Sequence, residues 1–106
     1  MLLTSSQQLY KQQLEREGFI NIFLQVDFAG KHYAPNRNGL KTAYMVVEGQ
    51  LTITFFGHPK ILDPGDRADV PANCIYEATA GGNGCSYLVA EYPEPVLEGA
   101  ANAQAE

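Results

Sequence analysis

The chain has 106 residues, of which 45% are apolar and 18% are charged, a composition typical of a soluble globular domain. Twelve acidic side chains outnumber seven basic ones, so the net charge is −5, and a phosphate backbone or an anionic membrane surface would be repelled. No apolar run in the sequence approaches the ~20 residues that span a bilayer. We therefore expect one domain over residues 1–106, with no nucleic-acid partner and no membrane partner.

The first residues and the two cysteines bear on the cellular compartment. Met1 is not followed by a basic segment and a long apolar stretch, so no secretory signal is expected and a cytoplasmic location is predicted. Cys74 and Cys85 have ten residues between them and lack the paired Cys or His partners of a zinc site. We interpret both as reduced structural residues, with a single disulfide or a redox role as the alternatives.

A short helix is predicted at residues 4–17. Leu9, Tyr10 and Leu14 form an apolar stripe at helical spacing. Ser5 with Gln8 fits a capping box at the start of the helix, and a glycine at position 18 supplies the C-terminal stop. We expect this helix to pack on an edge of the β-structure that follows.

From residue 19 onward the apolar pattern changes to a period of two, which predicts β-strands. Turns are expected at residues 48–50, 56–60 and 81–84, and Asp63-Pro64-Gly65-Asp66 is a further strong turn signal. Short strands between closely spaced turns, without helices between them, indicate an antiparallel barrel or sandwich. The expected strands cover residues 20–26, 43–47, 51–56, 67–70, 75–79 and 85–92. The Pro-, Ala- and Glu-rich end at residues 93–106 is predicted to be an exposed tail.

Two spaced motifs run through this β-region. The first, G-x5-N-x-N-x3-T-x6-G, consists of Gly30, Asn36, Asn38, Thr42 and Gly49. The second, G-x5-P-x-N-x2-Y, consists of Gly65, Pro71, Asn73 and Tyr76. The spacing and the order of the two motifs resemble those of a small single-domain cupin, and the resemblance covers residues 18–92. The resemblance implies an all-β fold, a cupin-type antiparallel β-barrel (a double-stranded β-helix or jelly roll, RmlC-like) over residues 19–92 with one short N-terminal helix.

The same resemblance implies a divalent metal held by three His and one Glu. Carried over by position, those ligand positions fall on Asn36, Asn38, Thr42 and Tyr76. Amides and hydroxyls bind such metals weakly, whereas imidazole and carboxylate supply the usual affinity. His32 is a further candidate at the barrel entrance, but no set of three donors is apparent around it. We therefore predict no metal and no cofactor.

The resemblance also predicts where a ligand would bind. Neutral polar groups that converge inside an apolar barrel suit a small neutral or polar molecule. The candidate pocket residues are Asn36, Asn38, Thr42, Tyr44, Tyr76 and His32. In the alternative, these groups bond to one another and to trapped water, and the barrel is kept only as a scaffold.

Three further alternatives stay open at this point. One is a metal-independent, isomerase-like enzyme with Tyr76 as the general acid and His32 as the base. The second is a metal-dependent enzyme with non-standard ligands around His32. The third is an interaction module that uses the N-terminal helix and the edge strands. Because an open barrel leaves sheet edges unpaired, a homodimer is expected in each case.

Overall fold

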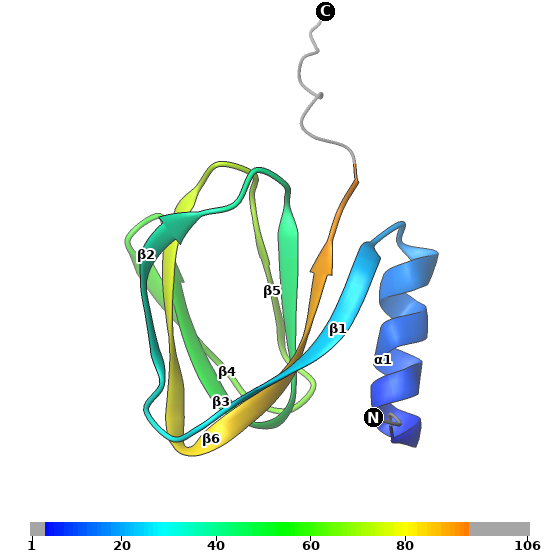
Figure 1. The fold of residues 1–106 in the computed structure, drawn as a ribbon, viewed down its shortest axis with the longest axis horizontal. Coiled ribbons are helices and arrows are strands. Elements are labelled where there is room, and N and C mark those ends of the chain that lie inside the picture. Colours follow the sequence, from blue (N-terminus) through cyan, green and yellow to red (C-terminus); the bar gives the residue numbers. More distant parts are fainter. Residues whose placement is uncertain (1–3, 94–106) are drawn as a thin grey trace, which may run out of the picture.

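The computed structural model describes residues 4–93, so the tail predicted for residues 93–106 lies outside the described residues except for Pro93. The elements in chain order are α1 (Ser5–Arg16), β1 (Ile20–Asp27), β2 (His32–Arg37), β3 (Thr42–Phe55), β4 (His58–Leu62), β5 (Arg67–Val70) and β6 (Ile75–Glu91). All strand pairs are antiparallel, which confirms the predicted all-β fold, and the strands curve into a barrel with α1 beside it (Figure 1). None of the helices in residues 4–93 is long and apolar enough to cross a membrane.

The N-cap of helix α1 lies one residue before the predicted cap, Ser5. Thr4 is the N-cap: its hydroxyl accepts a hydrogen bond from the Gln7 backbone N–H (3.2 Å), and the Gln7 side chain accepts one from the Thr4 N–H (2.9 Å). The prediction of Ser5 and Gln8 as the capping box was therefore wrong by one position, because both residue pairs fit the same spacing. Gly18 ends the helix as predicted, with φ +100° and the paired N–H bonds of a Schellman motif.

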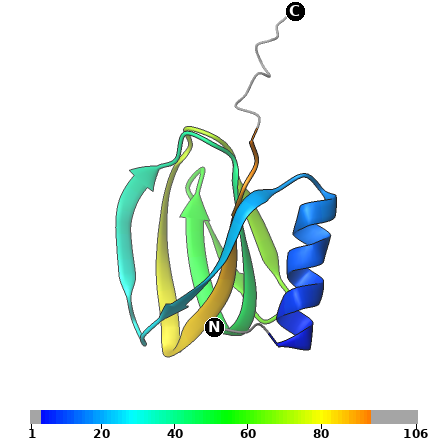
Figure 2. The ribbon, with the colours of Figure 1, turned by 45° about the vertical axis from the view of Figure 1, so that its right-hand side comes forward.

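The helix packs against the outside of the barrel, beside β1, as the two views agree (Figure 2). Leu14 is fully buried and Tyr10 packs against the same cluster, as the predicted stripe requires. Leu9 was predicted to belong to that stripe but is 64% exposed. Arg67 on β5 adds a polar link, because its guanidinium donates two hydrogen bonds, of 2.8 and 2.7 Å, to the Glu17 carboxylate at the end of the helix.

Strands β3 and β6 are long, bent and paired with each other along most of their length. The C-terminal part of β6 and the N-terminal part of β3 join β1 and β5 in one half of the sheet. The remaining parts of β3 and β6 join β2 and β4 in the other half. The two halves face each other, and the buried side chains between them form the barrel core.

The bends lie where two tight turns were expected, at residues 48–50 and 81–84. The chain does not reverse there; instead β3 and β6 continue through irregularities at Gly49 and Gly84, which face each other across the sheet. A Cβ at Gly49 would collide with the Gly84 carbonyl oxygen, and both glycines have positive φ. The predicted turns were wrong because a bulge and a tight turn need the same positive-φ glycine.

These irregularities also change which face of each strand points inward. Before the bend, Thr42, Tyr44 and Val46 of β3 face the interior, and after it Leu51 and Ile53 do. A strand places successive side chains on opposite faces, so an extra residue in the bend shifts that alternation. Both halves of the long strands thereby present their apolar side chains to one core.

The predicted tight turn at residues 56–60 is confirmed but is shorter than expected. Phe56 and Gly57 are the loop of a two-residue hairpin, both with positive φ, and Phe55 pairs directly with His58. The sequence reasoning missed β4 and β2, because each contains a proline, Pro59 or Pro35, which cannot donate to a sheet. Both strands lie at edges of the sheet, where a proline is tolerated.

Candidate functional site

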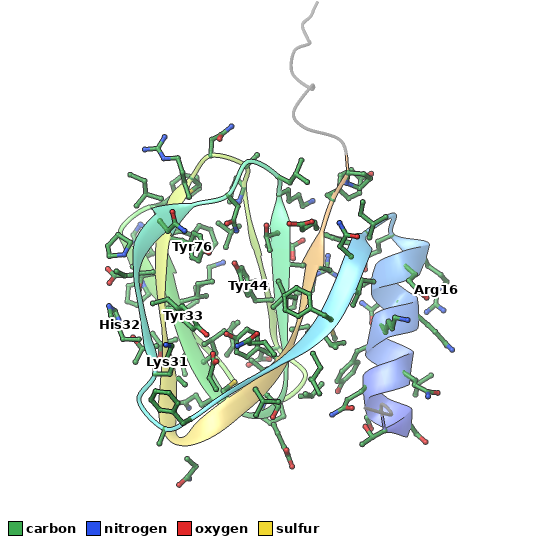
Figure 3. The ribbon with its side chains drawn as sticks, viewed as in Figure 1. Arg16, Lys31, His32, Tyr33, Tyr44 and Tyr76 are labelled. Carbon is green, nitrogen blue, oxygen red and sulfur yellow. The ribbon has the colours of Figure 1, made fainter. Side chains whose placement is uncertain are left out.

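A cavity of about 270 Å³ opens into the barrel between the two halves of the sheet. Five aromatic side chains form most of its wall: Phe23, Tyr33, Tyr44, Tyr76 and Tyr87. Four polar side chains complete its polar surface: Gln25, Asn38, Thr42 and Glu91. Ala78 and Val89 complete the apolar part, and Tyr33, Tyr44 and Tyr76 point into the interior (Figure 3).

Strand alternation positions these groups. On β1, Gln25 and Asp27 face the interior, whereas Ile22 and Leu24 face the helix. On β6 beyond the bend, Tyr87, Val89 and Glu91 face inward, and Leu88 and Ala90 pack under α1. The same sheet half therefore has an apolar outer face for the helix and a polar, aromatic inner face for the cavity.

A buried carboxylate lies at the base of this wall. Asp27 is 6% exposed and accepts hydrogen bonds from the hydroxyls of Tyr87 (2.6 Å) and Tyr33 (2.8 Å) and from the Gln25 amide (2.8 Å). Burial acts to raise the pKa of Asp27, but these three donors more than offset it, so the pKa lies below its usual value. Burial, followed by the neighbouring carboxylate, raises the pKa of Tyr87 far above its usual range. Asp27 is therefore ionised and Tyr87 is neutral at physiological pH.

A second network lies on β3 and the segment before it. The Asn38 amide donates to the Thr42 hydroxyl (3.1 Å) and to the Tyr44 hydroxyl (3.3 Å), and Thr42 in turn donates to the Leu40 carbonyl (3.0 Å). Tyr44 packs against Tyr76 with ring centroids 5.9 Å apart. Burial, and then the Tyr76 hydroxyl, raise the pKa of Tyr44 well above its ordinary value, so its hydroxyl stays protonated.

The structure brings together four of the six pocket residues expected from the sequence. Asn38, Thr42, Tyr44 and Tyr76 all line the cavity. Asn36 does not line it: its backbone pairs with that of Tyr76, but its side chain is exposed.

His32 also lies away from the cavity, on the outer side of β2 (Figure 3). Its ring contacts the hydroxyl of Thr79 (2.7 Å) and lies 3.7 Å from the Glu77 carboxylate. Alternation explains this placement, because Tyr33, the next residue, faces inward. The arrangement therefore gives no support to Tyr76 and His32 as an acid–base pair at one substrate.

Sequence reasoning missed several residues of the cavity wall and its base. Gln25 lies in the strand predicted at residues 20–26 and Asp27 directly follows it, and this pair of polar residues two apart was the available signal. The contributions of Tyr33, Tyr87 and Glu91 had no comparable signal, because they depend on the bends of the long strands and on a strand that was not predicted.

The side chains around the cavity do not fit the metal of the resembled family. Of the four ligand positions, three line the cavity, and they carry an amide, an aliphatic hydroxyl and a phenol: Asn38, Thr42 and Tyr76. Within residues 4–93, no three His, Cys, Asp or Glu side chains come together in a way that could hold a metal ion. Weak neutral oxygen donors of this kind do not replace a set of imidazoles and a carboxylate.

Both cysteines are free thiols in this structure. Cys85 is buried next to the Asp27 cluster, and burial, with a smaller effect from Asp27, raises its pKa to about 11. A thiol with that pKa is protonated at neutral pH and is therefore a poor nucleophile. This agrees with a structural role for Cys85.

The arrangement of strands can be compared with known proteins. No protein-family model matches the sequence, and no curated protein matches it. Solved structures do match: a cupin superfamily protein from Desulfitobacterium hafniense has a TM-score of 0.60 and 24% identity over 67% of this chain and 65% of that one. The chain has a cupin fold.

Two other solved cupin-like structures show the same likeness. An RmlC-like cupin from Shewanella frigidimarina has a TM-score of 0.59 and 20% identity, over 66% of this chain and 63% of that one. KdgF from a Halomonas species has a TM-score of 0.60 and 18% identity, over 72% of this chain and 92% of that one. This chain thus spans about two thirds of the length of the Desulfitobacterium and Shewanella cupins. The likeness establishes the cupin fold alone, and the function must be argued from the side chains that line the cavity.

Proposed function

We propose that this cupin-fold chain binds a small polar molecule in the barrel cavity, without a metal at the positions that hold one in the resembled family. The observation that carries the proposal is the cavity itself, about 270 Å³, with aromatic walls and a few polar groups. Ligand sites are concave and mainly apolar, with a small number of placed polar groups that fix orientation. The volume lies just under the ~300–1,000 Å³ typical of ligand pockets, so the ligand is a small metabolite.

The order of the wall supports binding over a purely structural role. The wall side chains are held by the two networks around Asp27 and Asn38, so their positions are set before a ligand arrives. Preorganised side chains lose little conformational freedom on binding, which favours affinity. A barrel that served only as a scaffold would gain more stability from filling this space with apolar side chains.

Thermal unfolding across a panel of polar metabolites tests the proposal. A ligand that binds only the folded protein raises its melting temperature. We expect at least one compound to do so for the wild type and not for Val89→Phe, which places a ring inside the cavity. Ile61→Phe is the matched control, because Ile61 is exposed on β4. Circular dichroism confirms that each variant is folded.

Two results would contradict the proposal. One is the absence of any response to the panel by the wild type. The other is a response that persists unchanged in Val89→Phe, since the compound would then bind outside the cavity. Elemental analysis of protein purified without chelator tests the metal-independent part, and near-stoichiometric iron, manganese, nickel or zinc would overturn it.

We also propose that the chain forms a homodimer through β1. This strand ends the hydrogen-bonded order of the sheet; Ile20 and Val26 on it, and Phe28 just after it, are exposed apolar side chains. An unpaired edge with apolar side chains favours association with a second sheet edge. Size-exclusion chromatography with light scattering should give a dimer that Val26→Lys dissociates and Ile61→Lys does not, because these side chains are equally exposed, at 60% and 61%. A wild-type monomer would overturn the proposal.

A cytoplasmic location stays a prediction from the sequence.

A further inference from the structure

Most of the polar hydrogens on the described cavity wall are already engaged within the wall. On one side, the hydroxyls of Tyr33 and Tyr87 both donate to Asp27, and the Gln25 amide donates to the same carboxylate and, at 3.3 Å, to the Tyr33 hydroxyl. A hydroxyl that donates in one direction still offers its lone pairs in others. This side of the cavity therefore presents acceptors to an incoming molecule.

The opposite side of the cavity has the same character. The Asn38 amide hydrogens are directed to Thr42 and Tyr44, and the Thr42 hydroxyl donates to the Leu40 carbonyl. The groups left for a ligand are mostly acceptors, namely the Asn38 amide oxygen and the hydroxyl lone pairs, together with the hydroxyl hydrogens of Tyr44 and Tyr76. A molecule that enters the cavity must therefore supply hydrogens more than it accepts them.

The charge in and beneath the wall is negative. Glu91 lines the cavity, with one carboxylate oxygen held by the Asn21 amide at 3.0 Å, and ionised Asp27 lies beneath the wall. Among the described residues that line the cavity, there is no Lys, Arg or His. Lys31 is nearby, with its ammonium 5.1 Å from the Tyr33 ring centroid, but it is not part of the lining. An anionic ligand would meet repulsion and no compensating cation.

The aromatic side chains supply a third kind of attraction. Tyr44 is flanked by Tyr76 and Tyr87, with ring centroids at 5.9 and 6.2 Å, so three rings gather on one part of the wall. Ring faces carry negative electrostatic potential and attract cations within about 6 Å of the centroid, and more strongly where water is excluded. The Lys31 ammonium, 5.1 Å from the Tyr33 ring centroid, shows that one ring of this wall already attracts a cation.

We propose that the cavity takes a small organic ammonium ion with N–H groups, held by the tyrosine rings, by the hydroxyl and amide oxygens and by the Glu91 carboxylate. This inference rests on the proposed function, that the cavity binds a small molecule. A neutral polyol could donate to the same acceptors, including Glu91, but would lack the charge attraction to the carboxylate and to the ring faces. A primary or secondary ammonium ion uses all three features of the wall.

Matched probes that differ in charge test the proposal. The first pair is n-butylammonium and butan-1-ol, and the second is choline and its uncharged carbon analogue 3,3-dimethylbutan-1-ol. Isothermal titration calorimetry at neutral pH should give at least about tenfold tighter binding for n-butylammonium than for butan-1-ol, a difference of roughly 1.4 kcal/mol. Choline should also bind more tightly than its analogue, but with a smaller ratio, because it has no N–H group to donate.

Two substitutions on the same strand locate the interaction. Glu91→Gln keeps the shape of the side chain and removes the charge, and should weaken n-butylammonium binding about tenfold while leaving butan-1-ol unchanged. Glu77→Gln is the control, because Glu77 lies on β6 but outside the cavity lining, near His32. It should leave both probes unchanged. Tyr76→Leu should weaken the ammonium probe more than the alcohol, because leucine keeps apolar contact but has no ring face.

The outcomes separate this inference from the proposed function. If neutral compounds bind in the wild type and lose binding in Val89→Phe, but ammonium probes bind no better than their alcohols, the ammonium proposal fails and small-molecule binding stands. Ammonium binding that is equally strong in Glu91→Gln also overturns the ammonium proposal. If no probe and no panel compound binds, both proposals fail.

Discussion

The Tyr87 hydroxyl and the Asp27 carboxylate form a buried hydrogen bond of 2.6 Å that joins β6 to the end of β1. Tyr87 is 4% exposed and Asp27 is 6% exposed, so neither group can exchange this partner for bulk water. The bond fixes one tyrosine of the cavity wall and offsets part of the free energy required to bury a carboxylate. It therefore couples the stability of the barrel to the shape of the cavity.

Tyr87→Phe should destabilise the protein through this bond. Hydrogen bonds to charged groups contribute about 1.5–3 kcal/mol, and the substitution leaves Asp27 with one donor fewer. Urea unfolding followed by circular dichroism should show a loss in that range. Tyr33→Phe removes a bond to the same carboxylate from a half-buried position and should cost less. Equal and negligible losses in the two variants would show that the Asp27 cluster contributes little to stability.

The ionisation of Asp27 should make the free energy of unfolding depend on pH. Its pKa is lower in the folded protein than in the unfolded chain, where it is about 3.9. The folded state therefore binds the proton less tightly than the unfolded chain. The stabilisation from ionised Asp27 is complete at a pH above the pKa of the unfolded chain. It is lost as the pH falls through the pKa of the folded protein.

Asp27→Asn isolates that contribution. Chemical unfolding of wild type and variant should give a free-energy difference that is largest near pH 7 and shrinks as the pH is lowered below about 4. Glu17 also has a lowered pKa, owing first to its hydrogen bonds with Arg67, but it is intact in both proteins and cancels in the difference. A free-energy difference that does not change with pH would contradict the assignment.

Gly49→Ala should be among the most damaging single substitutions in the chain. A Cβ there would meet the backbone of Gly84 and Cys85, and the position has φ +80°. Gly57→Ala is the matched control, since Gly57 has φ +75° but no heavy atom within 4 Å of the added carbon. We expect about 1–2 kcal/mol for Gly57→Ala, from the left-handed backbone alone. The loss for Gly49→Ala should be about 4 kcal/mol or more, or the variant should not fold. Similar losses from thermal unfolding of both variants would show that the two long strands can separate at the bend.

Thr4→Ala should shorten or fray helix α1. The Thr4 hydroxyl accepts the Gln7 N–H, and loss of an N-cap costs about 1 kcal/mol. Ser5→Ala is the control, because Ser5 is the first helical residue and does not cap the helix. Its effect on the free energy of unfolding, measured by urea denaturation, should be within about 0.5 kcal/mol. A larger loss of unfolding free energy from Ser5→Ala than from Thr4→Ala would show that Ser5 is the N-cap.

Local signals in the sequence were sufficient for the fold class. The change of apolar period at residue 19 marks the passage from helix to strands, and Gly18 ends the helix with the φ that glycine allows most easily. The turn at Asp63–Asp66 is confirmed for the same reason, with Gly65 at φ +92°. Asn73 of the second motif has a φ of +61°, a conformation that asparagine adopts more readily than most residues other than glycine.

The sequence by itself therefore determined the all-β class, the helix and the cupin spacing, because each depends on local backbone preference and on alternation within one segment. Only the tertiary structure decided that β3 and β6 bend at Gly49 and Gly84, since a bulge and a turn make the same local demand and differ in which distant strand completes the hydrogen bonds. The cavity follows from that pairing. The bends set the inward face of each long strand, and so they place Tyr87 and Glu91 on the same cavity wall as Tyr44. The pairing of β2 with β6 places Tyr33 inward and leaves His32 outside.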